Sequence, residues 1–322
     1  MESTHALLIL LAPPLALLLD LLLGDRPGLP HPVRLLGGVL DRQERLSRRL
    51  APGKLFAAGV FWTVVNAAAA WAVVQILTEI PYLGALIGLY FAYAGLALGQ
   101  LLRESRKVRR LLAGGDLNAA RTAVGQLVSR ETGDLDEEGV RRTLAESISE
   151  NLCDGFVAPF LFLCLGGPAL LWAYKAISTM DSMWGYRTEK YERLGRFCAR
   201  ADDVLAWVPA RLTAALILLA GRVTGRRVEG WKTKVPADAA RMESPNAGWP
   251  MAAAAWVCGA PMGGSAVYHG QTREKPRLGP DTGVWDESRL RRLHRLCLWC
   301  GLGGGLLIWL YFAALAWSVS SF

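Results

Sequence analysis

The uncharged run LFAAGVFWTVVNAAAAWAVVQIL, residues 55–77, decides the fold class of this chain. A helix needs roughly 20 mostly apolar residues to cross the hydrocarbon core of a bilayer. This run supplies them without a single Asp, Glu, Lys or Arg. Windows of similar length and composition cover residues 5–23, 80–102 and 298–320. The sequence therefore predicts a polytopic membrane protein built from helices.

Three weaker apolar segments accompany these four windows. Segments 155–177 and 203–221 contain Lys175 and Arg211, and the run 249–267 is interrupted by Gly and Pro. We predict that the first two enter the membrane as re-entrant hairpins or tilted helices, and that the third is buried or re-entrant. Overall, 52% of the 322 residues are hydrophobic, against about 45–50% in a typical soluble domain.

Basic residues predict the orientation of the chain. Loop 24–54 holds seven Lys and Arg, whereas the amino terminus and the turn after residue 77 hold none. Because cytoplasmic loops carry the excess of basic residues, we place the amino terminus outside, and loop 24–54 and region 103–150 inside. The same rule favours the cytoplasm for 178–202 and 222–295. We thus predict an inner (plasma) membrane protein whose active face is cytoplasmic.

Region 103–150 places apolar residues at helical spacing, as in Val108, Leu111 and Leu112, between turns that contain Gly and Asp. This pattern indicates short amphipathic helices on the cytoplasmic side. No run of alternating residues is long enough to predict a sheet. The predicted fold is an all-α, polytopic membrane helical bundle with re-entrant or tilted segments, in one integral membrane domain of residues 1–322.

The net charge of +8 does not indicate nucleic-acid binding. The basic residues lie in juxtamembrane loops beside acidic ones, without the basic stripe interleaved with aromatic residues that such binding needs. Attraction to anionic membrane lipid explains most of them.

The stretch ESISENLCDG, which begins at Glu146, concentrates carboxylates where a helix meets an apolar segment. Glu150 and Asp154 follow at intervals of four, so the three carboxylates share one helical face and repel one another. At a membrane boundary, oxygen ligands favour a hard cation such as Mg²⁺. Salt bridges to Arg141 and Arg142 are the structural alternative.

Two further motifs suit anions. His31 and Arg34 are held beside prolines, which presents them stiffly to a phosphate or carboxylate, although a capped helix exit explains them as well. Residues 244–250, SPNAGWP, form a tight polar turn whose backbone N–H groups are able to hold an anion; a plain turn into a re-entrant segment is the alternative.

A fourth cluster extends from Lys175 through Asp181 and Tyr186 to Asp202 and Asp203. The lysine ends an apolar segment, so snorkelling of its amine to the headgroups is the simpler explanation for it. The three aspartates have no comparable structural explanation.

In their order along the chain, these motifs resemble the CbiB/CobD family of cobalamin-biosynthesis membrane proteins over nearly the whole sequence. The resemblance rests on His31-Pro32-Val33-Arg34, Glu146-Ser147 with Glu150-Asn151 and Asp154-Gly155, Thr179-Met180-Asp181-Ser182-Met183 with Gly185-Tyr186, Asp202-Asp203 with Pro209-Ala210-Arg211, and residues 244–250. The chain departs from the family pattern at Arg26, inserted in a Gly-Asp-Pro motif. It departs again at Ser178 and at Ala206-Trp207, where the family commonly has Asn.

The resemblance implies an adenosylcobinamide-phosphate synthase, which joins aminopropanol or its phosphate to a carboxylate of adenosylcobyric acid in an ATP-dependent amide ligation. It implies Mg²⁺ as cofactor, ATP as co-substrate and, as further partners, membrane lipid and other corrinoid-pathway enzymes. The candidates for catalysis are Glu146, Glu150, Asn151, Lys175 and Asp181; for substrate binding His31, Arg34, Tyr186, Asp202, Asp203, Arg211, Ser244 and Asn246; and for Mg²⁺ Glu146, Glu150, Asp154 and Asp181. No G-x-x-x-x-G-K-[ST] motif occurs, so a P-loop is excluded.

Two other classes of function remain open at this point. A transporter usually shows ionisable residues near the centres of its spans, whereas here the clean spans are almost free of charge. A non-catalytic membrane sensor or scaffold of the AmpE type needs the helical frame but not the full set of polar motifs.

Overall fold

The computed structural model describes residues 2–25, 31–268 and 270–320, so Arg26 and Pro27 of the first motif lie outside the described residues. Helices dominate the described part, which confirms the predicted all-α polytopic class. The chain divides into two compact units: unit 1 contains residues 1–97, 158–206 and 305–322, and unit 2 contains residues 98–157 and 207–304. That all of it forms one integral membrane domain stays a prediction.

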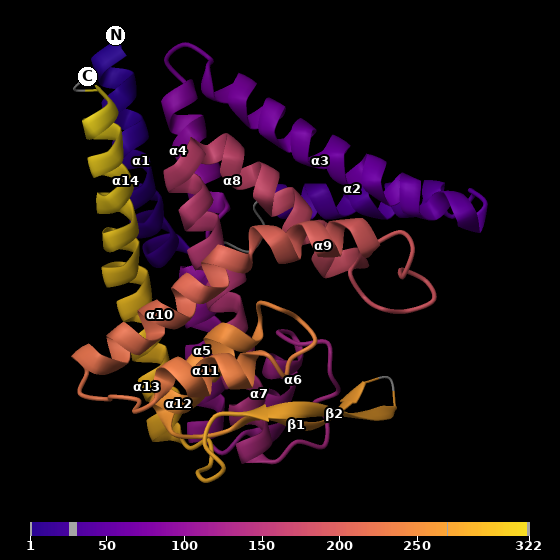
Figure 1. The fold of residues 1–322 in the computed structure, drawn as a ribbon, viewed down its shortest axis with the longest axis vertical. Coiled ribbons are helices and arrows are strands. Elements are labelled where there is room, and N and C mark those ends of the chain that lie inside the picture. Colours follow the sequence, from indigo (N-terminus) through magenta and orange to yellow (C-terminus); the bar gives the residue numbers. More distant parts are fainter. Residues whose placement is uncertain (1, 26–30, 269, 321–322) are drawn as a thin grey trace. The chain divides into compact units, whose positions relative to one another are not determined.

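Unit 1 is built mainly from apolar helices. Its elements are α1 (Glu2–Leu23), α2 (Pro32–Ser47), the short 3₁₀ helix η1 (Pro52–Lys54), α3 (Leu55–Thr78), α4 (Gly84–Ala94), α8 (Ala158–Trp184), α9 (Arg196–Leu205) and α14 (Gly305–Ser320). Helix α3 packs along α8, and α1 runs beside α14 (Figure 1). A Cβ atom at Gly59 of α3 would lie 2.0 Å from the backbone oxygen of Leu194, so only glycine permits this approach.

A buried cluster fixes the amphipathic helix α2 against α8 and α9. Its fully buried members are Leu40, Met180, Trp184, Leu194 and Cys198. Removing such side chains from water stabilises the packing by roughly 1.5–3 kcal/mol for each large one. The cluster thereby holds in place the helix that follows His31.

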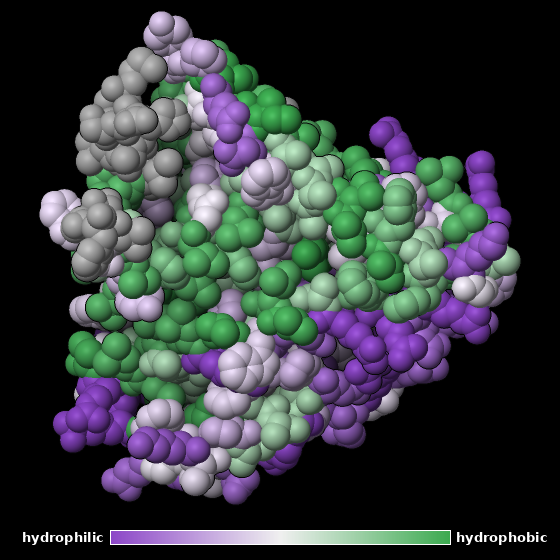
Figure 2. Space-filling view, turned by 45° about the horizontal axis from the view of Figure 1, so that its top comes forward, coloured by the Kyte–Doolittle hydropathy of each residue, from purple (hydrophilic) through white to green (hydrophobic). Residues whose placement is uncertain are grey.

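The surface of α3 is apolar, as a helix in contact with lipid requires. Within Pro52–Thr78, only 17% of the most apolar 18-residue stretch is buried. The exposed side chains of α3 include Phe61, Val64, Trp71 and Ile76. Figure 2 shows a broad hydrophobic area on the face of the molecule drawn there. By length and composition, four described helical segments are able to cross a membrane: Pro52–Thr78, Gly84–Ala113, Glu137–Trp184 and Glu287–Ser318. The count rises to five if α9 and α10 (Trp207–Val223) form one broken span.

Helix α8 is interrupted in the middle of its apolar half. Gly166 and Gly167 leave helical geometry, with φ values of −150° and +70°. Pro168 then begins the second half, where its fixed φ suits a helix start. The interruption falls within segment 155–177, for which the sequence predicts a re-entrant or tilted course.

Unit 2 combines the amphipathic helices with a small hairpin. Its elements are α5 (Leu98–Ala113), α6 (Leu117–Gly125), α7 (Glu137–Leu152), the π-helical turn η2 (Cys153–Val157), α10, α11 (Trp231–Ala239), α12 (Gly248–Cys258), β1 (Met262–Tyr268), β2 (Gln271–Leu278), α13 (Glu287–Trp299) and the π-helical turn η3 (Cys300–Gly304). The predicted turns begin helices: Asp116 caps α6 and Asp136 caps α7 through their carboxylates.

Helix α12 forms the centre of unit 2. The four alanines 252–255 are fully buried, and α7, α10, α11 and α13 pack around the helix. Small side chains allow this crowding, because neighbouring helices approach closely at alanine. Segment 249–267 is therefore not one span: its first part is this buried helix and its last part is strand β1.

The prediction that the chain has no strands is wrong for one hairpin. Strands β1 and β2 pair antiparallel, with Met262 opposite Leu278 and Gly264 opposite Lys275, so two residues of β2, Pro276 and Arg277, lie opposite Gly263 and form a bulge. Its φ is +86°, and a Cβ there would lie 2.0 Å from the backbone oxygen of Pro276. Only Met262, Ala266 and Leu278 of the two strands are buried, so the sequence lacks the alternation that predicts strands.

We expect Gly263→Ala to destabilise unit 2 far more than Gly264→Ala. Both glycines have positive φ, which costs a non-glycine residue about 1–2 kcal/mol. Only at position 263 would the new methyl group also collide with backbone. Thermal unfolding of the purified protein in detergent measures the difference, and equal midpoints for the two variants would contradict the close approach of Gly263 to the backbone of Pro276.

Candidate functional site

The predicted site residues fall into two groups, one in each unit. Unit 2 holds Glu146, Glu150, Asn151, Asp154, Arg211, Ser244 and Asn246, and unit 1 holds His31, Arg34, Lys175, Asp181, Tyr186, Asp202 and Asp203. Each group has its own geometry.

In unit 2, the structure brings Arg211 and the 244–250 turn together. Nη1 of Arg211, in the second turn of α10, donates hydrogen bonds to the backbone oxygen of Trp207 (2.8 Å) and to Oδ1 of Asn246 (3.3 Å). Its guanidinium lies 4.0 Å from the ring centroid of Trp207 and 4.6 Å from that of Trp249. We call these residues, with Ser244, the Arg211 cluster.

The local sequence explains how the cluster is built. Oγ of Ser244 accepts hydrogen bonds from the backbone N–H groups of Asn246 (3.3 Å) and Ala247 (3.2 Å), which fixes the turn at the start of α12. Trp249 then lies one turn beyond Asn246 and faces the guanidinium. Sequence reasoning missed both tryptophans as site residues, although aromatic residues flanking an arginine are a signal of cation–π stacking.

The guanidinium of Arg211 is held in place, but not all of its N–H groups are hydrogen-bonded. Among the described residues, its hydrogen bonds use only Nη1, so the N–H groups of Nε and Nη2 remain for a ligand. The side chain is half-buried between two indoles. Such a planar, oriented cation suits bidentate recognition of a phosphate or carboxylate.

Glu146, predicted as catalyst and metal ligand, has both carboxylate oxygens occupied. Oε2 pairs with Nη2 of Arg130, and Oε1 accepts the backbone N–H of Gly263 at 2.7 Å. The side chains are nearly removed from water, with 2% of Glu146 and 8% of Arg130 exposed. In this state Glu146 joins α7 to the start of β1. The partner is Arg130, whereas Arg141 and Arg142 pair with Glu137 and Glu138.

Glu150 and Asn151 lie on the exposed side of the end of α7, and Asp154 is half-buried in η2. Lys275 of β2 is the foremost cation whose charge acts on Glu150. Nδ2 of Asn151 donates to the backbone oxygen of Ser147 at 2.9 Å. Glu150 is thus the one of the predicted carboxylates on α7 that is open to a ligand.

Within the described ranges, no group of three or more His, Cys, Asp or Glu side chains is arranged to hold a metal ion. Mg²⁺ is commonly bound through one or two carboxylates, with water and substrate phosphates completing its shell. Glu150 and Asp154 fit that limited role. The predicted participation of Glu146 and Asp181 as further ligands stays a prediction.

In unit 1, His31 is the N-cap of α2. Its Nδ1 accepts the backbone N–H of Val33 at 3.3 Å, so the neutral ring carries its proton on Nε2, which lies 3.6 Å from Oδ1 of Asp25. Burial lowers the pKa of His31 below its usual 6.5, Asp25 opposes this, and the charges of Lys175 and Arg34 add to the lowering. The imidazole is therefore neutral at pH 7, and its Nε2–H is able to donate to a ligand.

The other predicted residues of unit 1 are spread over α8, α9 and the segment between them. Lys175 and Asp181 are half-buried on α8, and Asp202 and Asp203 are half-buried on α9, whereas Arg34 and Tyr186 are exposed. The charges of Asp181 and Asp202 both act on Cys198, so both carboxylates lie near this residue. The charges of Lys175 and Arg34 act on His31, which brings these three residues into one neighbourhood.

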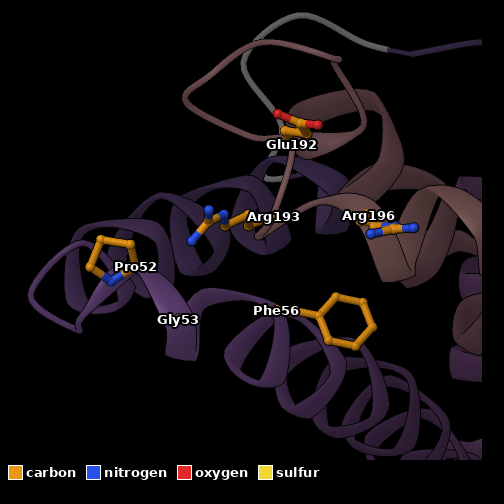
Figure 3. A pocket seen from close by; sticks show the side chains of 6 residues that line it. All are labelled: Pro52, Gly53, Phe56, Glu192, Arg193 and Arg196. Carbon is orange, nitrogen blue, oxygen red and sulfur yellow. The ribbon is translucent and has the colours of Figure 1, made fainter.

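Two pockets lie away from these residues. One of about 340 Å³ in unit 1 is lined by Pro52, Gly53, Phe56, Glu192, Arg193 and Arg196 (Figure 3). Figure 3 shows the side chains of Phe56 and Arg193 on facing segments of the chain. The other pocket, in unit 2, is lined largely by arginines. Neither contains a residue that the sequence predicts for the site.

We expect folding stability to fall as the pH drops from 7.5 to 5, in part because of His31. The unfolded histidine takes up a proton near pH 6.5, while the folded one resists protonation to lower pH, so acid favours the unfolded state across this window. His31→Asn keeps an N-cap acceptor but does not titrate. The variant should show a flatter profile of thermal midpoint against pH, and an unchanged slope would refute the assignment.

Comparison with known proteins agrees with the order of motifs. A family described as CobD/Cbib protein matches residues 13–297. The chain is 36% identical over 288 residues to the cobalamin biosynthesis protein CobD of Listeria monocytogenes, covering 87% of this chain and 90% of that protein. It is 38% identical over 299 residues to CobD of Klebsiella pneumoniae (88% and 92% covered).

It is also 37% identical over 294 residues to the cobalamin biosynthesis protein CbiB of Salmonella choleraesuis, covering 87% of this chain and 91% of that protein. No solved structure matches the chain. Since the family match and the relatives span most of the sequence, the chain belongs to the CobD/CbiB family.

Proposed function

We propose that this protein acts in cobalamin biosynthesis as an ATP-dependent amide ligase of the adenosylcobinamide-phosphate synthase type. Its substrates would be adenosylcobyric acid and aminopropanol or aminopropanol phosphate, and it would work at the cytoplasmic face of the inner (plasma) membrane. The names of its relatives support the pathway. The oriented guanidinium of the Arg211 cluster is the observation that supports the chemistry.

The reaction explains the need for such a cation. A carboxylate does not react with an amine at neutral pH, so one oxygen first attacks the γ-phosphorus of ATP, which gives an acyl phosphate and ADP. The amine then attacks the acyl carbon, phosphate leaves and the amide forms. Negative charge grows on the phosphoryl oxygens during the first step, and preorganised donors such as Nε–H and Nη2–H of Arg211 stabilise it.

The other predicted residues would have more limited roles. Glu150 and Asp154 would hold Mg²⁺, which supplies charge neutralisation to the phosphates when bound. Asn151, Ser244 and Asn246 would orient substrate amide or phosphate groups. We propose that Glu146 positions α7 against the start of β1 and does not react itself, because both of its carboxylate oxygens are already engaged.

In unit 1, His31 would act as a hydrogen-bond donor. Its Nε2–H would contact the phosphate of aminopropanol phosphate, assisted by Lys175 and Arg34. The proton-acceptor role does not suit this tautomer, since Nδ1 is occupied by the N–H of Val33. Asp181, Asp202, Asp203 and Tyr186 remain candidates for binding the amine and the corrinoid.

The activity is tested directly with the purified protein in detergent, supplied with adenosylcobyric acid, aminopropanol phosphate, Mg²⁺ and ATP. We expect amidated corrinoid by mass spectrometry, with one ADP released for each amide formed. Arg211→Lys keeps the charge but loses the planar fork and the stacking, so kcat/KM should fall about 10- to 100-fold. Arg222→Lys, on an exposed position of the same helix, is the control and should keep wild-type rates.

Glu150→Gln should abolish turnover while the protein still inserts into the membrane and melts at the wild-type temperature. The side chain is exposed at the end of α7, so its charge serves a ligand rather than the packing. Glu243→Gln removes an equally exposed carboxylate from unit 2 and should leave the rate unchanged. Wild-type rates for Glu150→Gln would remove this residue from the mechanism, and silence of the wild-type protein with all components verified would favour a scaffold.

A further inference from the structure

The arginine-lined pocket of unit 2 lies at the opposite ends of α10 and α12 from the Arg211 cluster. The two helices run in the same direction: Arg211 meets Asn246 where they begin, and a Cβ on Gly221 would lie 2.8 Å from Cγ1 of Val257 where they end. At 1.5 Å per residue, the 12 residues from Arg211 to Val223 span about 18 Å. The pocket is therefore separate from the Arg211 cluster.

The pocket has a volume of about 440 Å³ and an unbalanced charge. Its ionisable lining consists of four arginines and one aspartate: Arg226, Arg227, Arg289, Arg292 and Asp286. The aspartate caps α13 and accepts hydrogen bonds from Nη1 of Arg289 (2.6 Å), from the backbone N–H of the same residue (2.8 Å) and from Oγ of Ser288 (2.7 Å). It neutralises at most one of the four cations.

Two of the arginines donate hydrogen bonds to backbone oxygens at the end of α12. Nε of Arg289 donates to the backbone oxygen of Gly259 at 3.2 Å, and Nη1 of Arg292 donates to that of Cys258 at 2.8 Å. Basic side chains are favourable beside the last carbonyls of a helix. This capping gives a structural reason for these two residues and also holds their guanidinium groups in a fixed orientation.

Capping does not explain Arg226 and Arg227. Both are exposed, and within the described part of the chain neither side chain has a hydrogen bond or an ion pair. The charges of Arg226 and Arg289 act on Arg292, so like charges gather at this pocket. Topology explains why basic residues follow α10, but it does not require them to converge with two others on one pocket.

We propose that this pocket binds a phosphate group. Four guanidinium groups offer planar, bidentate donors to its oxygens, and an anion would relieve their mutual repulsion. The amino terminus of the 13-residue helix α13 adds its favourable dipole. The phosphate would come from an anionic phospholipid headgroup or from a soluble phosphate ester. A headgroup is accessible because α10 and α13 both belong to candidate membrane spans whose ends meet here.

The full-length protein in uncharged detergent serves for the test. Inorganic pyrophosphate is titrated by calorimetry, and retention of phosphatidylglycerol against phosphatidylcholine is followed by native mass spectrometry. Arg226→Gln with Arg227→Gln should weaken binding of the preferred ligand by about tenfold or more, without lowering the unliganded melting temperature. Arg273→Gln with Arg277→Gln removes two exposed arginines of β2 that do not line the pocket, and should leave binding unchanged.

Loss of pyrophosphate binding in the first double variant alone would identify a soluble phosphate as the ligand. Loss of selective phosphatidylglycerol retention, without any effect of pyrophosphate, would identify a headgroup. Arg226→Lys with Arg227→Lys should bind with intermediate affinity, because lysine keeps the charge but not the fork. If neither pyrophosphate nor phosphatidylglycerol binds, the pocket is not a phosphate site. The same conclusion follows if the control, Arg273→Gln with Arg277→Gln, loses binding as much as Arg226→Gln with Arg227→Gln. Turnover in the ligase assay is not required for either result.

Discussion

The buried pair of Glu146 and Arg130 is the interaction on which the arrangement of unit 2 depends. Glu146 accepts one hydrogen bond from Arg130 and one from the backbone of Gly263, so a single carboxylate holds α7 and the start of the hairpin together. Removing one partner would leave an uncompensated charge in a site that water barely reaches, which typically costs about 3–5 kcal/mol. Opposite the bulge, the N–H of Gly263 thus has a charged acceptor in a buried environment.

Asp238 has a similar role on the neighbouring strand, at the same end of the hairpin. Its carboxylate, 6% exposed, accepts from the indole of Trp256 and from the backbone N–H of Gly279, each through Oδ2, and pairs with Arg241. These contacts connect α11, α12 and the end of β2. Two buried carboxylates thus hold one end of a hairpin of whose strand residues only Met262, Ala266 and Leu278 are buried, and neither carboxylate is free for chemistry in this state.

The charged residues of unit 2 therefore divide by their surroundings. Glu146 and Asp238 are buried and fully engaged, whereas Arg211 and Glu150 keep donors or acceptors open to a ligand. The parallel course of α10 and α12 places one oriented arginine at their beginning and the arginine pocket at their end. The indole of Trp207 supports Arg211 by stacking.

The sequence by itself determined the helical membrane class, the interruption of the 249–267 run and the candidate residues, because apolar length, glycine, proline and motif order are local properties. It also predicted that Arg211 and the 244–250 turn belong to the site. Only the tertiary structure decided that Glu146 is paired with Arg130, that Trp207 and Trp249 enclose the guanidinium, and that a bulged hairpin forms. Each of these depends on residues distant in the chain. Burial and a charged partner assign different roles to carboxylates, such as Glu146 and Glu150, that look equivalent on one helical face.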